Sequence, residues 1–179
     1  MLPKSSWPFY EKKTISKVSN CLKSGKVNYH TGFNCKKFEN LFSKKFGIKY
    51  CLAVTNGTVA LDIAIRVLQI KSNQKIITTP KSYFSSSSQI LRNNIKLVYS
   101  DISLVSQNLD PDSLLSAINK DIKAVIFVHL GGNPNGILEI SKICKKFKIF
   151  LIEDCSQAHG AKINNQYAGS FGDISIWSF

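Results

Sequence analysis

Residues 124–161 read AVIFVHLGGNPNGILEISKICKKFKIFLIEDCSQAHGA, and this stretch decides the fold class. The uninterrupted apolar run over 124–128 predicts a buried strand, and a second run over 149–152 predicts another. Between them, residues 137–147 carry apolar side chains at helical spacing. Strands that are apolar on both faces occur where helices cover both sides of a parallel sheet. We therefore predict an α/β fold with a mostly parallel sheet and helices on both faces.

The same alternation continues on both sides of this unit. Further strands are expected at 50–54, 75–79, 95–99 and 174–179, and further helices at 10–24, 36–46, 59–68, 83–92 and from Asp110-Pro111 onward. We expect an N-terminal helical segment over residues 1–47 and an α/β domain over 48–179. Trp177 and Phe179 leave large apolar groups at a strand end with nothing to cover them, so we expect this domain to be incomplete.

The basic charge of the chain has two interpretations. The 179 residues include 24 basic and 11 acidic ones, which gives a formal charge of +13 and suggests nucleic acid or an anionic ligand. Only Arg66 and Arg92 are arginines, and the lysine doublets fall on stretches that resemble solvated helix faces. Because base recognition relies on the bidentate arginine fork, we expect an anionic small molecule and no nucleic acid.

Membrane and metal partners are not expected either. No stretch approaches the roughly 18 apolar residues of a membrane span, and the first residues lack the apolar core of a secretory signal, so we expect a cytoplasmic protein. The five cysteines form no C-x-x-C pair, and no histidine lies at metal-ligand spacing from them. We expect free thiols and no metal, with Cys51 in the core. Cys155 is disfavoured as a nucleophile because no motif supplies its base.

Ligands of parallel sheets bind at the carboxyl ends of the strands, so the residues after each strand are candidates. Gly57 and Thr58 follow one strand and begin a helix, whose free N–H groups suit a phosphate; a plain capping turn is the alternative. Tyr83 follows another strand and suits either stacking on a planar ligand or packing in the core. His129 precedes two glycines without the G-x-G-x-x-G pattern, which disfavours a dinucleotide site and leaves a structural histidine as an alternative.

Asp154 follows the strand at 149–152. A buried carboxylate needs a partner. Asp154 therefore serves either as a helix N-cap or as the partner of a cationic cofactor nitrogen, as pyridoxal phosphate (PLP) enzymes require.

Six motifs then carry a family resemblance. They are T-N-G-T-V-A-L, T-T-P-K-S-Y, V-H-L-G-G, I-E-D-C-S-Q-A-H-G-A, G-S-F-G-D and W-S-F, in this order, with Y-H-T-G and Phe38-Glu39 before them. The chain resembles the DegT/DnrJ/StrS family of PLP-dependent aminotransferases, which act on nucleotide-linked keto-sugars. The resemblance covers about residues 28–179 and implies the large domain of the fold type I aminotransferases.

The resemblance implies two groups of cofactor-binding residues. Gly57, Thr58 and Ser178 match the residues that hold the cofactor phosphate. Tyr83 matches the aromatic residue that stacks on the pyridine ring. Two further residues also match positions around this ring: Asp154, which pairs with the ring nitrogen, and Gln157, which faces the ring hydroxyl.

One feature of the family is missing. The lysine that forms a Schiff base with the cofactor is expected a few residues beyond Phe179, and Lys162 does not occupy its position. The small C-terminal domain is missing as well, so we expect the chain to be an incomplete form. Tyr29, Thr31 and His129 lie in matching segments without an assigned role.

The resemblance implies transamination of a nucleotide-linked keto-sugar with an amino-acid donor, glutamate in this family, for surface-glycan or related amino-sugar biosynthesis. It also implies a homodimer in the full-length form. Two alternatives stay open. One is a PLP-dependent sugar dehydratase of the same family, which carries histidine in place of the lysine. The other is a non-catalytic fragment or pseudoenzyme.

Overall fold

The computed structural model describes residues 8–179. The helices are α1 (Lys12–Lys23), α2 (Asn34–Phe46), α3 (Gly57–Val67), α4 (Ser85–Arg92), α5 (Pro111–Ala117) and α6 (Ile137–Phe147), with a 3-10 turn η1 (Leu130–Gly132). The strands are β1 (Lys75–Thr78), β2 (Lys96–Tyr99), β3 (Ile122–Val128), β4 (Phe150–Asp154), β5 (Lys162–Ile163), β6 (Gln166–Tyr167) and β7 (Ile174–Ile176). None of the helices in this part of the chain is long and apolar enough to span a membrane.

The chain divides into two compact units. One contains the residues up to Lys45 together with Lys49–Ala53, and the other contains Phe46–Ile48 together with Val54–Phe179. The expected division into segments 1–47 and 48–179 stays a proposal, and residues 1–7 of the first segment lie outside the described part of the chain.

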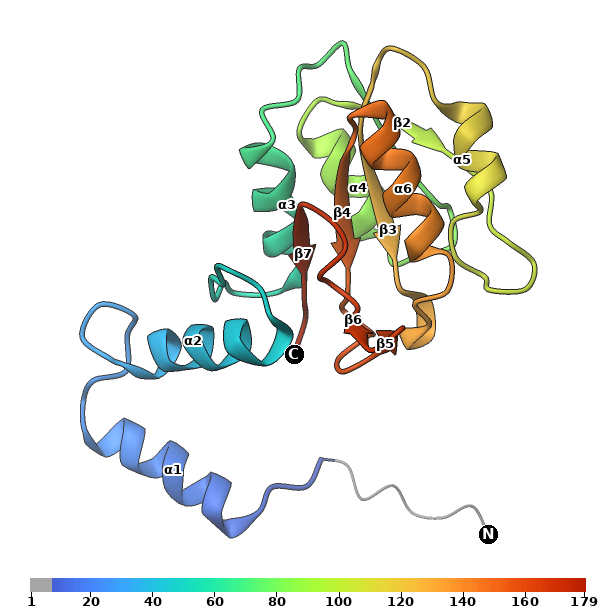
Figure 1. The fold of residues 1–179 in the computed structure, drawn as a ribbon. Helices are drawn as coiled ribbons and strands as arrows, with labels where there is room; N and C mark the ends of the chain where they lie inside the picture. Colours follow the sequence, from blue (N-terminus) through green and yellow to red (C-terminus); the bar gives the residue numbers. More distant parts are fainter. Residues whose placement is uncertain (1–7) are drawn as a thin grey trace, which may run out of the picture. The chain divides into compact units, whose positions relative to one another are not determined.

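A five-stranded sheet forms the centre of the larger unit (Figure 1). Its strand order is β2-β1-β3-β4-β7, and every neighbouring pair is parallel, which confirms the predicted sheet. The chain passes from β1 outward to β2 and then returns to the other side of β1 with β3. The direction of winding therefore reverses between β1 and β3. Ligands of open α/β sheets bind outside the carboxyl ends of the strands at such a reversal.

Helices cover both faces of this sheet, and each face has its own apolar core. Side chains of β3 alternate between the two cores, as the period of two along a strand requires. Ala124, Ile126 and Val128 pack with residues of α3 and α4, whereas Val125 and Phe127 pack with residues of α5 and α6. The continuous apolar run of β3 is thus explained by burial on both faces.

Local sequence signals explain where several elements begin and turn. Asp110 caps α5, since its Oδ1 accepts a hydrogen bond from the Ser113 N–H at 2.9 Å and proline follows as the first helical residue. The hairpin of β5 and β6 turns through Asn164 and Asn165, both with positive φ. Asparagine tolerates this conformation better than most residues, and a two-residue turn of this kind fits the twist of a hairpin.

The strand predicted at residues 50–54 is wrong, because this segment forms no strand. Its side chains are not buried either, since Leu52 is 63% exposed and Cys51 is only partly buried. An apolar run becomes a strand only where a neighbouring strand receives its hydrogen bonds. Here the N–H of Ala53 instead donates to the Glu39 side chain at 2.8 Å.

Candidate functional site

The turn into α3 packs closely against two serine side chains. A Cβ built on Gly57 would lie 3.0 Å from the Cβ of Ser178 and 3.4 Å from the Oγ atoms of Ser178 and Ser156. The structure thus brings together two of the predicted phosphate residues, Gly57 and Ser178, although they are far apart in the sequence. A side chain at position 57 would crowd both serine side chains.

The first turn of α3 offers free donors at the same place. Asn56 caps the helix, because its Oδ1 accepts from the Val59 N–H at 2.9 Å and its carbonyl accepts from the Ala60 N–H at 3.0 Å. The N–H groups of Gly57 and Thr58 have no acceptor within residues 8–179. Free N–H groups, the positive end of the helix dipole and serine hydroxyls together suit a phosphate. A plain capping turn accounts for Asn56 but not for this convergence of donors.

Asp154 is the last residue of β4 and is only 5% exposed. Its Oδ1 accepts a hydrogen bond from the Ser156 N–H at 3.0 Å, and no lysine, arginine or histidine of residues 8–179 forms an ion pair with it. The N-cap interpretation of Asp154 is wrong, because residues 155–161 form turns and no helix follows. A nearly buried carboxylate therefore lacks a cationic partner within the described chain, although burying an unpaired charge costs free energy.

Gln157 lies close to the turn that follows β3. Its Oε1 accepts a hydrogen bond from the Gly131 N–H at 2.7 Å. A Cβ built on Gly132 would lie 2.9 Å from the carbonyl oxygen of Gln157, so the second glycine permits this close approach. Because Oε1 is occupied, the amide Nε2 is the group that remains to face a ligand.

Tyr83 follows β1 at the same edge of the sheet, but it stands apart from the other candidates. Its side chain is 72% exposed, which excludes the alternative of core packing. Among the residues that the structure describes, no aromatic or cation–π pair joins its ring to another predicted site residue. An exposed ring past the end of β1 remains available for stacking on a planar ligand.

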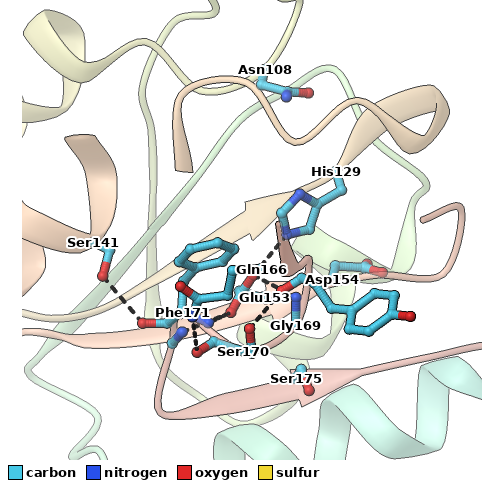
Figure 2. A network of polar contacts seen from close by, with 12 residues as sticks. Asn108, His129, Ser141, Glu153, Asp154, Gln166, Gly169, Ser170, Phe171 and Ser175 are labelled. Carbon is cyan, nitrogen blue, oxygen red and sulfur yellow. Dashed lines mark hydrogen bonds and ion pairs between the residues drawn. The ribbon is translucent and has the colours of Figure 1, made fainter. Parts of the chain in front are cut away.

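Glu153 lies beside Asp154 on β4, and alternation along the strand points the two side chains to opposite faces. Figure 2 shows its carboxylate at the centre of a hydrogen-bond network. Oε1 accepts from the N–H groups of Phe171 and Gly172 at 2.7 and 2.6 Å, and Oε2 accepts from the Gly169 N–H and from Nε2 of His129, both at 2.8 Å (Figure 2). Glu153 is fully buried, and these four donors use the full acceptor capacity of its two oxygens.

His129 is a buried histidine held by this network. Its Nε2 donates to Glu153, and its Nδ1 has no hydrogen-bond partner among the described residues. The ring packs edge-on against Phe127, with 4.9 Å between centroids. This geometry matches the structural interpretation of His129.

One group of side chains has the composition of a metal site. The ligand atoms of His129, Glu153 and Cys155 lie within 4.8 Å of one another, and all three residues are buried. A metal would have to displace hydrogen bonds from Glu153. Burial, followed by the nearby carboxylates of Glu153 and Asp154, raises the pKa of the Cys155 thiol well above its usual range, which keeps it protonated. These residues therefore form an anchoring network, and we assign them no metal.

Comparisons with known proteins show the family of this chain. A model of the DegT/DnrJ/EryC1/StrS aminotransferase family matches residues 8–179. The chain belongs to this family. It is 32% identical over 176 residues to GDP-perosamine synthase of Escherichia coli O157:H7, covering 96% of this chain and 48% of that protein. The family and the fold class predicted from the sequence are thereby confirmed.

Two solved structures resemble this family member closely. One is an aminotransferase from Psychrobacter cryohalolentis, with a TM-score of 0.95, 36% identity and coverage of 98% of this chain and 44% of that one. The other is GDP-4-keto-6-deoxy-D-mannose-3-dehydratase from E. coli with bound hydrated PLP, with a TM-score of 0.84, 30% identity and coverage of 91% and 43%. The chain spans less than half the length of these relatives.

Sequence reasoning missed two residues of this family member's site. The Oγ of Ser156 lies beside Gly57, and the only signal for it was its position between Asp154 and Gln157. Glu153 was noticed as a second carboxylate, but its partners are mainly backbone N–H groups, which no sequence motif reveals.

The five cysteines should differ sharply in reactivity. Burial raises the pKa of Cys144 to about 12 and raises that of Cys155 too, whereas Cys35 is exposed. A raised pKa keeps a thiol protonated to higher pH, and only the thiolate attacks disulfide reagents. With Ellman's reagent at about pH 8, we expect fast labelling of Cys35 and labelling of Cys144 and Cys155 only after denaturation. Mass spectrometry of the peptides measures this; rapid native labelling of Cys155 would contradict it.

Proposed function

We propose that this chain is the cofactor-binding part of a PLP-dependent aminotransferase that moves an amino group from an amino-acid donor to a nucleotide-linked keto-sugar. The observation that carries the proposal is the carboxylate of Asp154, which is nearly buried, accepts one N–H bond and has no cationic partner within residues 8–179. A protonated pyridine nitrogen is a cation of the right kind to pair with it. Bound PLP would supply a ring that withdraws electrons from the reacting carbon.

Three residues would orient the ring end of the cofactor. The Asp154 carboxylate would accept the ring N–H and hold the proton at that nitrogen. The exposed ring of Tyr83 would stack on the pyridine face. The Nε2 amide of Gln157, whose Oε1 is fixed by Gly131, would donate to the ring hydroxyl.

The phosphate end would be held at the start of α3. The free N–H groups of Gly57 and Thr58 would donate to phosphate oxygens, and the hydroxyl of Ser178 would complete the site. Ser156 is a fourth contributor, because its Oγ also lies near Gly57. The site fits the group, since these donors gather where a Cβ at Gly57 would crowd both serine side chains.

Substitution of Gly57 tests the phosphate site. Gly57→Ala should lower the affinity for PLP about tenfold or more, because overpacking costs about 1–3 kcal/mol and about 1.4 kcal/mol is a factor of ten. Ala60→Ser, one turn along the same helix, serves as the control and should bind PLP normally. Absorbance titration with PLP measures both variants. Equal binding by Gly57→Ala and the control would contradict the phosphate assignment.

A sugar dehydratase is the second candidate, because the chain is 30% identical to a solved dehydratase that holds PLP. By the resemblance, the two functions differ at one position beyond Phe179. Sequencing the genomic locus across codon 179 decides between them: a lysine in the continuing frame supports the aminotransferase, and a histidine supports the dehydratase. A stop codon after Phe179 would favour the non-catalytic alternative.

We further propose a cytoplasmic location and a homodimer for the full-length form.

A further inference from the structure

We propose that Glu153 is a positioning residue, whose buried carboxylate fixes segment 169–172 and thereby sets the place of the Ser178 hydroxyl beside Gly57. The inference rests on the proposed function, in which Ser178 completes the phosphate site. Glu153 itself does not touch the cofactor in this proposal. It acts through the backbone that leads into β7.

The carboxylate of Glu153 holds segment 169–172 by hydrogen bonds. Three of the four hydrogen bonds to Glu153 come from backbone N–H groups of this segment, at 2.6 to 2.8 Å. Hydrogen bonds to an ionised acceptor are about twice as strong as neutral ones. The next residue is attached to β4 as well. The Asp173 N–H donates to the Leu151 carbonyl at 2.9 Å, and the Leu151 N–H donates to Oδ2 of Asp173 at 2.8 Å.

The position of segment 169–172 in turn determines the position of Ser178 at the proposed phosphate site. Segment 169–172 leads directly into β7, which pairs with β4 through Ile152↔Ile174, Glu153↔Ser175 and Asp154↔Ile176. Ser178 follows β7 by two residues, and its Cβ lies 3.0 Å from a Cβ built on Gly57. A shift of β7 along β4 would therefore move the Ser178 hydroxyl relative to the free N–H groups of α3.

The attachment also depends on the chemistry of position 153. A carboxylate offers two acceptor oxygens, and each already accepts two hydrogen bonds. In Glu153→Gln one oxygen becomes an NH₂ group, which donates and cannot accept. The N–H groups of Phe171 and Gly172 would then face another donor if the amide nitrogen takes the place of Oε1, and the Gly169 N–H would face one if it takes the place of Oε2. Glutamine has nearly the same shape, so the variant changes the hydrogen bonds and leaves the packing volume unchanged.

A direct role in the chemistry does not fit this residue. Glu153 is fully buried on the face of the sheet opposite to Asp154, on the side of the α5 and α6 core that contains Leu151. The hydroxyl of Ser141 on α6 also binds this segment, because it donates to the Phe171 carbonyl at 3.1 Å (Figure 2). In this proposal Glu153 therefore acts from the α5 and α6 face of the sheet, through segment 169–172, on the edge where the cofactor would bind.

The test compares two ligands that differ only in the phosphate, PLP and pyridoxal. For Glu153→Gln we expect the affinity for PLP to fall roughly tenfold, while that for pyridoxal stays within about twofold. In a Ser178→Ala background, Glu153→Gln should have little further effect on PLP, because the two residues act on one contact. Glu139→Gln, an exposed glutamate on α6, is the matched control. Equal losses for both ligands would show general destabilisation and overturn the inference.

A second measurement covers the case in which Glu153→Gln does not fold. Hydrogen exchange of the unmodified chain should slow at the amides of Gly169, Phe171 and Gly172 when PLP is added, and much less with pyridoxal. If PLP slows exchange at residues 154–158 but leaves segment 169–172 unchanged, the positioning role is wrong while the proposed function stands. If the unmodified chain binds neither ligand, the proposed function itself fails.

Discussion

Asp154→Ala is expected to lose most of the affinity of the chain for PLP while the protein stays folded. Removing one partner of a buried, hydrogen-bonded charge pair costs about 2–5 kcal/mol, a fall in affinity of roughly thirtyfold or more. Without cofactor, the same variant should unfold at an equal or higher temperature, because the nearly buried carboxylate has no cationic partner within residues 8–179. PLP titration and thermal unfolding measure the two effects.

Asp154→Asn tests the charge of this side chain separately from its hydrogen bond. The amide can still accept from the Ser156 N–H, so the local turn is preserved, but it carries no charge to pair with a ring cation. We expect it to bind PLP nearly as weakly as the alanine variant. Asp112→Asn, on the exposed side of α5, is the control and should bind normally. Unchanged binding by Asp154→Asn would contradict the pairing of Asp154 with the ring nitrogen.

Gly169→Ala is expected to destabilise the fold strongly. Gly169 has a φ of +89°, and a Cβ there would lie 2.5 Å from Cζ2 of Trp177 and 3.1 Å from Sγ of Cys155. Left-handed strain costs roughly 1–2 kcal/mol, and overpacking in a core adds about 1–3 kcal/mol. Urea unfolding should therefore show a loss of about 2–5 kcal/mol in unfolding free energy.

Gly160→Ala separates these two causes. Gly160 has a similar φ of +82°, but nothing lies within 4 Å of a Cβ built on it. Only the backbone strain should remain, so the loss should be about 1–2 kcal/mol. If the two variants unfold alike, the close packing of Gly169 against Trp177 does not contribute to stability.

The parallel sheet was predictable because its central strands are buried on both faces. β3 is a nearly uniform apolar run, β4 begins with apolar residues 150–152, and the helix between them has clear periodicity, so local pattern and burial agree. The segment at 50–54 has the same appearance in the sequence. It failed as a strand because strand formation depends on a neighbour that composition does not reveal, and the N–H of Ala53 bonds to Glu39 instead.

The sequence placed Asp154 correctly at the end of a strand and Gly57 correctly at the start of a helix, and their roles in cofactor binding stay predictions. Glu153 could not be predicted, because its role depends on backbone N–H groups brought to it by the fold. Its backbone donors are 16 to 19 residues away in the sequence, and any residue except proline supplies the same group. Ser156 was missed for a similar reason, since its hydroxyl matters only through its position beside Gly57.

The attachment of segment 169–172 to Glu153 also bears on the order in which the sheet assembles. These contacts span 16 to 19 residues, whereas the contact of Thr78 on β1 with Ile126 on β3 spans 48. The entropy lost in closing a loop grows with its length. Joining β4 to β7 through these contacts therefore closes a shorter loop than joining β1 to β3, and it brings the strand that carries Asp154 to the strand that leads to Ser178.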